Sequence, residues 1–335
     1  MKNSKFKIRK SNSAPRLRRL AKAIVALAAL WAVVVVVGEG YKDRDYVPYF
    51  LEHKGHLVTA TESKLEPDTA FDVVHIELED TNGLQIEGHL RIPHQSAPQR
   101  PALIILGGVR TGRRTIDHLG DTGDWLVLAL DYPYRGKKSG LTRTEFLAAL
   151  PAMRRAVMDT VPAAMLAVDY LERRGDVDMG RVLLAGGSFG ALFSPALAAA
   201  DQRITAVAIF FGAGDLHALI DANLELAWPL KPVVSWIGSV LVSPLEPLKY
   251  IGRIAPRPVF FLNGTGDEAM PVACSRALHD TAGEPKTISW LDVGHVDIRS
   301  REFHERVLEE FLIWLRQIEF IGPDEKLGLV PETVE

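Results

Sequence analysis

Cysteine is almost absent from this chain, whose 335 residues contain a single one, Cys274. One cysteine excludes a disulfide within the chain and any metal site built from several cysteine thiolates. The sequence also lacks internal repeats, which excludes architectures assembled from stacked repeat units. We expect neither a cofactor nor a metal site.

Acidic residues are missing from residues 1–22, which carry nine lysines and arginines. The whole chain has 39 basic and 42 acidic residues, so the rest of the chain carries 30 basic residues against 42 acidic ones, a balance of −12. This excess of negative charge on the folded body argues against a nucleic acid as a partner.

Charged residues are missing from residues 23–38, a run of sixteen. A membrane-spanning helix needs about 20 apolar residues, whereas the apolar core of a cleaved signal peptide needs about 7–15. We therefore expect an uncleaved signal anchor, with a cleaved signal peptide as the alternative. A helix of a globular core would carry a polar face, which this stretch lacks. Because basic flanks stay in the cytoplasm, the body of the protein should lie across the membrane, on the extracytoplasmic side.

The rest of the chain is expected to hold one domain at residues 71–320, with a linker before it at 39–70 and a polar tail after it at 321–335. Apolar and polar residues alternate along 71–78 and 84–92, and turn-forming residues separate the two runs. This pattern predicts a β-hairpin at the start of the domain.

Continuous apolar runs, typical of buried parallel strands, alternate with helical segments through the remainder of the domain. The sequence therefore predicts an α/β fold with a mostly parallel, helix-covered sheet. Residues 213–250 are apolar and interrupted by prolines, and we expect them to form a lid. The strands are expected at residues 101–106, 125–130, 182–185, 204–211, 258–263 and 287–291, and the longest helices at about 144–174 and 301–320.

Residues 186–190 read Gly-Gly-Ser-Phe-Gly and lie between an expected buried strand and an expected helix. In that context Gly-x-Ser-x-Gly predicts a sharp turn that lifts the hydroxyl of Ser188 above the sheet. The strained turn requires small residues two positions before and after the serine, which Gly186 and Gly190 provide. Outside that context the same five residues would indicate only a glycine-rich turn.

An acid and a histidine follow two later strands. Asp267 comes after the strand at 258–263, and His295 comes after the last strand. Because catalytic groups gather beyond the carboxyl ends of parallel strands, we expect both beside Ser188. Glu268 is the alternative for the acid. His304 competes with His295 but lies inside the last expected helix.

With these motifs the chain resembles the α/β-hydrolase family, in the branch of dienelactone hydrolases and acyl-peptidase-like esterases. The resemblance covers about residues 71–317 and includes the loop at 131–136 as well as the three motifs above. It implies that Ser188 is the nucleophile, Asp267 the orienting acid and His295 the base.

Physical chemistry agrees with these roles. A serine hydroxyl becomes a good nucleophile when an imidazole takes its proton, and a carboxylate on the other ring nitrogen sets the imidazole tautomer. The oxyanion needs N–H donors, which we expect from Phe189 and from either Gly108 or Val109. The sequence departs from many family members in having Leu106 where they carry a histidine.

Three arginines near the second oxyanion segment, Arg110, Arg113 and Arg114, could bind an anionic substrate, but a solvated turn is the simpler interpretation. Cys274 is interpreted as a small core residue. We expect a membrane-anchored serine hydrolase that cleaves an ester or thioester through an acyl-enzyme. The alternatives are an acyltransferase or peptidase with the same three residues, and a non-catalytic binding protein with the same fold.

Overall fold

The computed structural model describes residues 14–65, 71–94, 97–137, 139–296 and 300–322. The chain divides into two compact units, Met1–Arg44 and Asp45–Glu335. The basic residues expected to lie in the cytoplasm belong in part to 1–13, outside the described residues. The polar tail expected at 321–335 likewise lies almost wholly outside them.

In the first unit, helix α1 (Ala14–Lys42) contains the uncharged run expected from the sequence. Its Arg18–Lys42 segment is long and apolar enough to cross a membrane, and it is the one helix of this kind among the described residues. Length and composition alone support this statement, and a signal sequence near the N-terminus would meet the same criteria.

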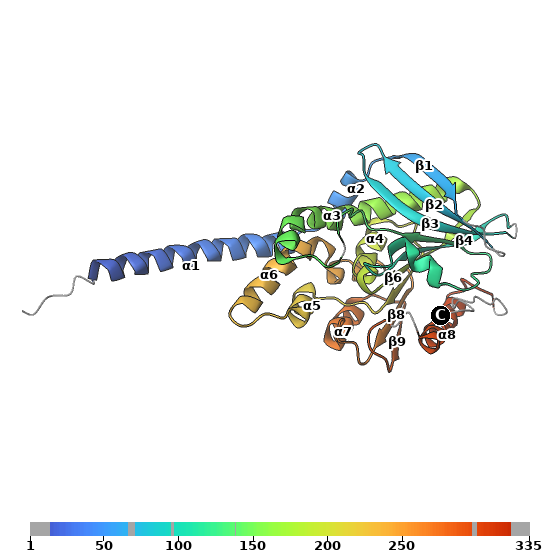
Figure 1. Cartoon of the computed structure of the whole chain (residues 1–335). Coiled ribbons are helices and arrows are strands. Elements are labelled where there is room, and N and C mark those ends of the chain that lie inside the picture. The colour runs from blue at the N-terminus through green and yellow to red at the C-terminus, as the bar shows by residue number, and fades with distance from the viewer. Residues whose placement is uncertain (1–13, 66–70, 95–96, 138, 297–299, 323–335) are drawn as a thin grey trace, which may run out of the picture. The chain divides into compact units, whose positions relative to one another are not determined.

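The second unit is built on one nine-stranded sheet with the order β1-β2-β3-β5-β4-β6-β7-β8-β9 (Figure 1). The first four strands in this order pair antiparallel and the remaining pairs are parallel. The strands are β1 (Leu57–Lys64), β2 (Phe71–Asp80), β3 (Gln85–Pro93), β4 (Arg100–Leu106), β5 (Leu126–Leu130), β6 (Val177–Gly187), β7 (Ala206–Phe210), β8 (Val259–Gly264) and β9 (Lys286–Leu291). The predicted hairpin and the predicted parallel strands are confirmed.

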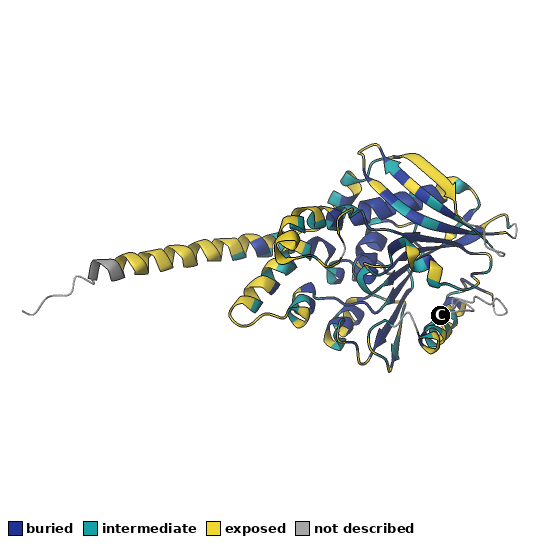
Figure 2. Ribbon diagram, in the orientation of Figure 1, coloured by how far each residue is buried: buried dark blue, intermediate teal, exposed yellow. Residues whose placement is uncertain are grey.

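Helices cover both faces of the central strands, which explains their continuous apolar sequences. Every residue of β4 and β5 is buried, and Figure 2 shows the middle of the sheet in dark blue. Helix α8 (Arg301–Gln317) packs Phe311 and Trp314 against Phe260 of β8 on one face. Helices α3 (Arg143–Arg174) and α4 (Ser194–Ala200) contact each other and β6.

Residues 39–70, expected to be a linker, contain regular structure that belongs to the second unit. Helix α2 (Val47–His53) buries Phe50, and β1 forms the edge strand by pairing with β2. The linker prediction was wrong here because seven of the eight residues of β1 are exposed, so no apolar alternation marks the strand.

The last helix also ends earlier than expected, at Gln317, and Phe320 then packs into the core as part of the following turn.

The segment expected to form a lid contains two helices, α5 (Leu216–Asn223) and α6 (Leu230–Val242), followed by short 3₁₀ turns. The carboxylate of Glu246 accepts hydrogen bonds from the backbone N–H groups of Asp215 (2.9 Å) and Leu216 (2.8 Å), at the start of α5. Burial raises the pKa of Glu246, although these N–H groups act in the opposite direction. This carboxylate ties the two ends of the segment together.

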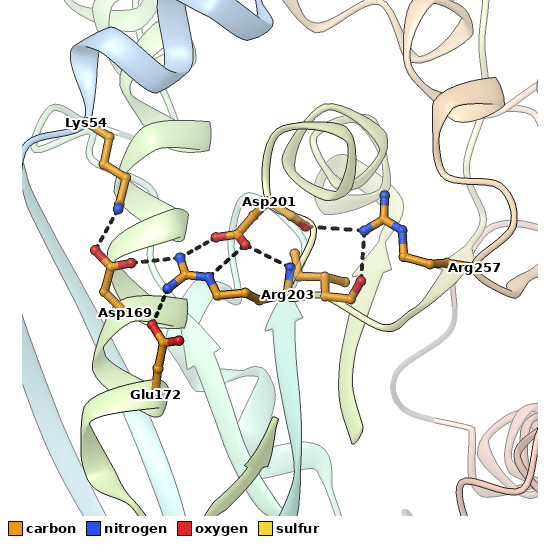
Figure 3. A network of polar contacts seen from close by, with 7 residues as sticks. Lys54, Asp169, Glu172, Asp201, Arg203 and Arg257 are labelled. Atoms are coloured by element: carbon orange, nitrogen blue, oxygen red, sulfur yellow. Dashed lines mark hydrogen bonds and ion pairs between the residues drawn. The ribbon is translucent and has the colours of Figure 1, made fainter. Parts of the chain in front are cut away.

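A network of polar contacts links helices α2, α3 and α4 (Figure 3). The guanidinium of Arg203 donates to Asp201, just after α4, and to Asp169 of α3 at 2.7 Å. Lys54 reaches the same Asp169 at 2.7 Å. Arg257 donates to four backbone carbonyl groups, including that of Asp201. The network links α2, α3 and α4 to the segment before β8, and so fixes the helix that follows Ser188.

Candidate active site

Ser188 lies at the turn between β6 and α4, at the start of the 3₁₀ turn η2 (Ser188–Leu192). Its φ angle is 52°, a left-handed conformation that non-glycine residues rarely adopt. A Cβ on Gly186 would overlap the hydroxyl of Ser194, and one on Gly190 would overlap the carbonyl group of Leu106. The turn therefore requires glycine at both positions, as the sequence predicts.

The three residues expected to act together lie within hydrogen-bonding distance of one another. Ser188 Oγ is 2.7 Å from Nε2 of His295, and Nδ1 of the same ring is 2.8 Å from Oδ2 of Asp267. Ser188 follows the carboxyl end of β6, Asp267 that of β8 and His295 that of β9. These strands are neighbours in the order β6-β7-β8-β9, so the three residues lie at the same edge of the sheet. The structure thus brings together a hydroxyl, an imidazole and a carboxylate in a continuous chain.

Asp267 is held rigidly in this chain. Its side chain has no exposed surface, and Oδ1 accepts hydrogen bonds from the backbone N–H groups of Ala269 (2.9 Å) and Met270 (2.8 Å). Oδ2 is left for His295. The neighbouring Glu268 is exposed, so the loop turns one carboxylate inward and the other toward solvent.

His295 lies at the border between protein and solvent. Its side chain is 30% exposed, and its ring stands edge-to-face with that of Phe211, with 5.9 Å between the centroids. Phe211 follows β7 and also has a positive φ angle, 53°. The imidazole is therefore oriented by an aromatic wall and a carboxylate while one side stays open.

A buried polar cluster supports the end of β8, four residues before Asp267. The side-chain amide of Asn263 donates to the carbonyl oxygen of Gly212 at 2.9 Å and to the hydroxyl of Ser275 at 3.0 Å. Nε2 of His279 lies 3.0 Å from Oδ1 of the same Asn263. Burial lowers the pKa of His279 to about 4, so the ring is neutral near pH 7. The sequence prediction did not include this cluster, because its members come from three separate segments.

The residues predicted to stabilise an oxyanion lie on two segments that touch. The close contact between Gly190 and Leu106 brings the end of β4 against the turn that contains Phe189. Gly108 and Val109 follow on the same loop, and Val109 is exposed. The carbonyl oxygen of Gly108 accepts hydrogen bonds from two N–H groups further along the loop, which closes it into a tight turn.

Tyr132 holds this loop from the side of the core. Its hydroxyl donates to the carbonyl oxygen of Gly107 at 2.5 Å, and burial raises the pKa of Tyr132, so the hydroxyl stays protonated. The ring also packs against Phe189 (5.0 Å between centroids) and Phe193 (5.4 Å). One side chain therefore contacts both segments that are predicted to supply the oxyanion donors. The sequence did not predict this role for Tyr132, because it marked only the loop at 131–136 as part of the family resemblance.

Two of the three arginines near this loop are paired with carboxylates of the protein. Arg113 lies against Glu87 and 3.5 Å from Asp131, and Arg114 is 3.2 Å from Asp117. Arg110 is exposed. This arrangement favours the interpretation as a solvated turn.

The remaining candidates lie outside the hydrogen-bonded chain. His304 lies in α8, and Cys274 is buried in α7 (Val272–Thr281), where burial raises the pKa of its thiol. Cys274 packs with Ala213 and Met270 in a small apolar cluster, as expected of a core residue. In the described part of the chain, no three His, Cys, Asp or Glu side chains are grouped so that they could hold a metal ion.

Comparison with known families is decisive for the fold. A model of the dienelactone hydrolase family matches residues 86–295, more than half of the chain and a range that includes Ser188, Asp267 and His295. The chain belongs to the dienelactone hydrolase family. As a member it has the α/β-hydrolase fold, and it is an enzyme of the esterase type.

Two relatives of this hydrolase are described as uncharacterized proteins. YfhR of Salmonella typhimurium is 28% identical over 141 residues, which are 41% of this chain and 48% of the relative. The match therefore spans about half the length of that relative. YqkD of Bacillus subtilis is 22% identical over 312 residues, 88% of this chain and 94% of the relative.

Solved structures share the fold. Acetyl xylan esterase 1 from a Thermoanaerobacterium species superposes with a TM-score of 0.60 at 17% identity, over 83% of this chain and 93% of the esterase. An acetyl xylan esterase from a Paenibacillus species gives a TM-score of 0.58 at 16% identity, over 80% and 92% of the two chains. At these identities the likeness concerns the fold of the hydrolase.

Proposed function

We propose that this hydrolase is a serine esterase that cleaves an ester or thioester through an acyl-enzyme, with Ser188, His295 and Asp267 as its catalytic residues. The observation that carries the proposal is the unbroken chain of hydrogen bonds from Ser188 Oγ through His295 to Asp267. Membership of a family of hydrolases supports it.

In the first half-reaction, Ser188 Oγ attacks the carbonyl carbon of the substrate and gives its proton to Nε2 of His295. The carbonyl oxygen takes up the negative charge. When the tetrahedral intermediate collapses, the bond to the alcohol or thiol breaks, and the leaving group takes the proton from Nε2. The acyl group stays on Ser188.

In the second half-reaction, a water molecule replaces the leaving group. His295 takes a proton from the water, whose oxygen attacks the acyl carbon, and the proton then returns to Ser188 Oγ as the acid departs. Asp267 stays ionised throughout and holds a proton on Nδ1, so that Nε2 is free to act as the base. The open side of His295 provides a path for the water.

The oxyanion is stabilised by backbone N–H groups, for which the candidates are Phe189 and either Gly108 or Val109. Each such donor typically contributes a factor of about 10²–10³ in turnover. The contact between the two segments supports this assignment, as does the anchoring of the loop by Tyr132.

A fluorophosphonate probe tests the proposal on the full chain in detergent, because it reacts with an activated serine. The wild-type protein should be labelled, and Ser188→Ala should lose the label and at least about 10³-fold in hydrolysis of p-nitrophenyl esters. The control is Ser289→Ala, which removes a hydroxyl group on β9 that bonds to Glu310 and should keep both. If the Ser188→Ala variant were still labelled by the probe, the nucleophile would be a different residue. A series of esters of rising chain length, with matched thioesters, then defines the acyl group.

The apolar segment of α1 supports a further part of the proposal, that the protein is anchored in a membrane with its catalytic unit on the extracytoplasmic side. The full chain should float with liposomes and stay bound through a high-salt wash. Protease added on the extracytoplasmic side should digest the catalytic unit. If the mature protein began at or beyond Gly38, the apolar segment would be a cleaved signal peptide and the protein would have no anchor in this segment.

A further inference from the structure

In helix α6 the buried positions are polar and the exposed positions are apolar, which is the reverse of an ordinary surface helix. Its buried positions are the serines Ser235 and Ser239, four residues apart on one face. Both hydroxyls are satisfied within the protein, the first by Asp221 and the carbonyl oxygen of Lys231, the second by the carbonyl oxygen of Trp236. A surface helix of a soluble domain would turn its apolar stripe toward the core.

The exposed positions of α6 are apolar instead, and Figure 2 draws much of the α6 ribbon in yellow, the colour of exposed residues. The spacing of three and four residues places them on one stripe. We call this stripe, with the tryptophan that precedes the helix, the outer face of α6. It consists of Trp228, Leu230, Val233, Val234, Ile237 and Leu241, all of them exposed.

The chemistry of the outer face is that of a membrane interface. Trp228 is 85% exposed, and the whole stretch 226–245 contains one charged residue, Lys231. Acidic residues are missing from this stretch, although the chain outside 1–22 is acidic. An apolar helix face with an exposed tryptophan and a lysine is the pattern that binds at the boundary of headgroups and acyl chains.

The catalytic unit follows the candidate membrane span directly along the chain. The unit begins at Asp45, which pairs with Arg253 at 3.0 Å. The next residue, Tyr46, stacks under the ammonium group of Lys249, seven residues after the end of α6. Two residues lie between Lys42 and Asp45, so the three Cα–Cα steps that join them span at most about 11 Å. A membrane span that ends at Lys42 therefore leaves only this short length of chain before the catalytic unit.

We propose that the outer face of α6 lies on the lipid bilayer, its apolar side chains inserted at the interface, so that the catalytic unit is docked on the membrane as well as tethered to it. This inference rests on the membrane anchor proposed above. It makes α6 a second, peripheral contact with lipid. The segment 213–250 is then a docking element, whereas the sequence suggested a lid.

Two cysteine variants of the full chain test the docking. Ile237→Cys on the outer face and Ile313→Cys on α8 replace isoleucines of similar exposure, 41% and 45%. Figure 1 shows α8 well away from α6. Both variants are made in a Cys274→Ala background, labelled with an environment-sensitive fluorophore and placed in nanodiscs of equal parts phosphatidylcholine and phosphatidylglycerol. Fluorophosphonate labelling checks that each variant keeps its fold, and Leu241→Cys repeats the measurement on the same stripe.

Insertion to the depth of the headgroup boundary should let nitroxide lipids quench the probe at position 237 at least about threefold more than the probe at 313, with a matching loss of quenching by aqueous iodide. Equal access of iodide to both probes, in a chain that floats with liposomes, overturns the docking and leaves the anchor standing. A probe at 237 that is shielded from iodide but not quenched by nitroxide lipid overturns it as well, because protein then covers the face. A chain that fails to float removes the anchor and the inference with it.

Discussion

The hydroxyl of Tyr132 donates a hydrogen bond of 2.5 Å to the carbonyl oxygen of Gly107, and its ring packs edge-on against Phe189. Through these two contacts one buried side chain touches both segments proposed to stabilise the oxyanion. The loop after β5 therefore helps to set the geometry of loops after β4 and β6.

Tyr132→Phe keeps the ring and removes the hydrogen bond, so the fold should survive while the loop at Gly107 loses its anchor. Loss of an oxyanion donor costs about 10²–10³ in turnover, and a displaced donor should cost less, about tenfold in kcat with little change in KM. The control is Tyr134→Phe, two residues along the same loop. Ester hydrolysis under steady-state conditions gives both constants, and equal effects of the two variants would contradict the role of Tyr132.

Asp267→Asn should lower turnover by about 10⁴, because an amide in place of the carboxylate favours the wrong tautomer of His295. The matched control is Glu268→Gln, which changes the adjacent but exposed carboxylate and should leave activity near the wild-type level. The comparison uses kcat/KM for one p-nitrophenyl ester. A larger loss from Glu268→Gln would move the acid to the neighbouring position.

His279 should make the protein less stable in mild acid. Burial lowers the pKa of His279 from 6.5 to about 4, so the unfolded chain binds more protons than the folded one between these values, and stability rises with pH across this window. The contribution is therefore complete above about pH 6.5 and is lost as the pH falls toward 4. Asp280 acts against the shift, whereas Lys286 and Arg276 act with it.

The measurement is the free energy of unfolding of the full chain in detergent at pH 7 and pH 5, for the wild type and for His279→Gln. The variant removes the titrating group, and its amide can still reach Asn263. Its stability should depend less on pH than that of the wild type. An identical pH dependence in both proteins would show that other groups dominate in this range.

The sequence by itself determined the turn at Ser188 and the buried parallel strands, because each depends on residues close together in the chain. The glycines at 186 and 190 mark the turn at Ser188 because the steric requirement concerns residues two positions away. Continuous apolar runs predicted the parallel strands for a similar reason, since burial on both faces excludes polar residues from each run. The alternation of strands and helices, and with it an α/β fold with a mostly parallel sheet, could be derived in this way, whereas the α/β-hydrolase fold was implied by the resemblance of the motifs to that family.

Tertiary structure alone decided the rest. Asp267 and Glu268 are adjacent carboxylates, and only the loop conformation turns one toward His295 and the other toward solvent. Strand β1 has an exposed, polar sequence and exists because β2 offers it a backbone edge. The apolar positions of α6 were visible in the sequence, but periodicity does not say whether a stripe faces the core or the outside. That choice is made by packing, which here buries the serines and leaves the stripe of Leu230, Val233, Val234, Ile237 and Leu241 exposed.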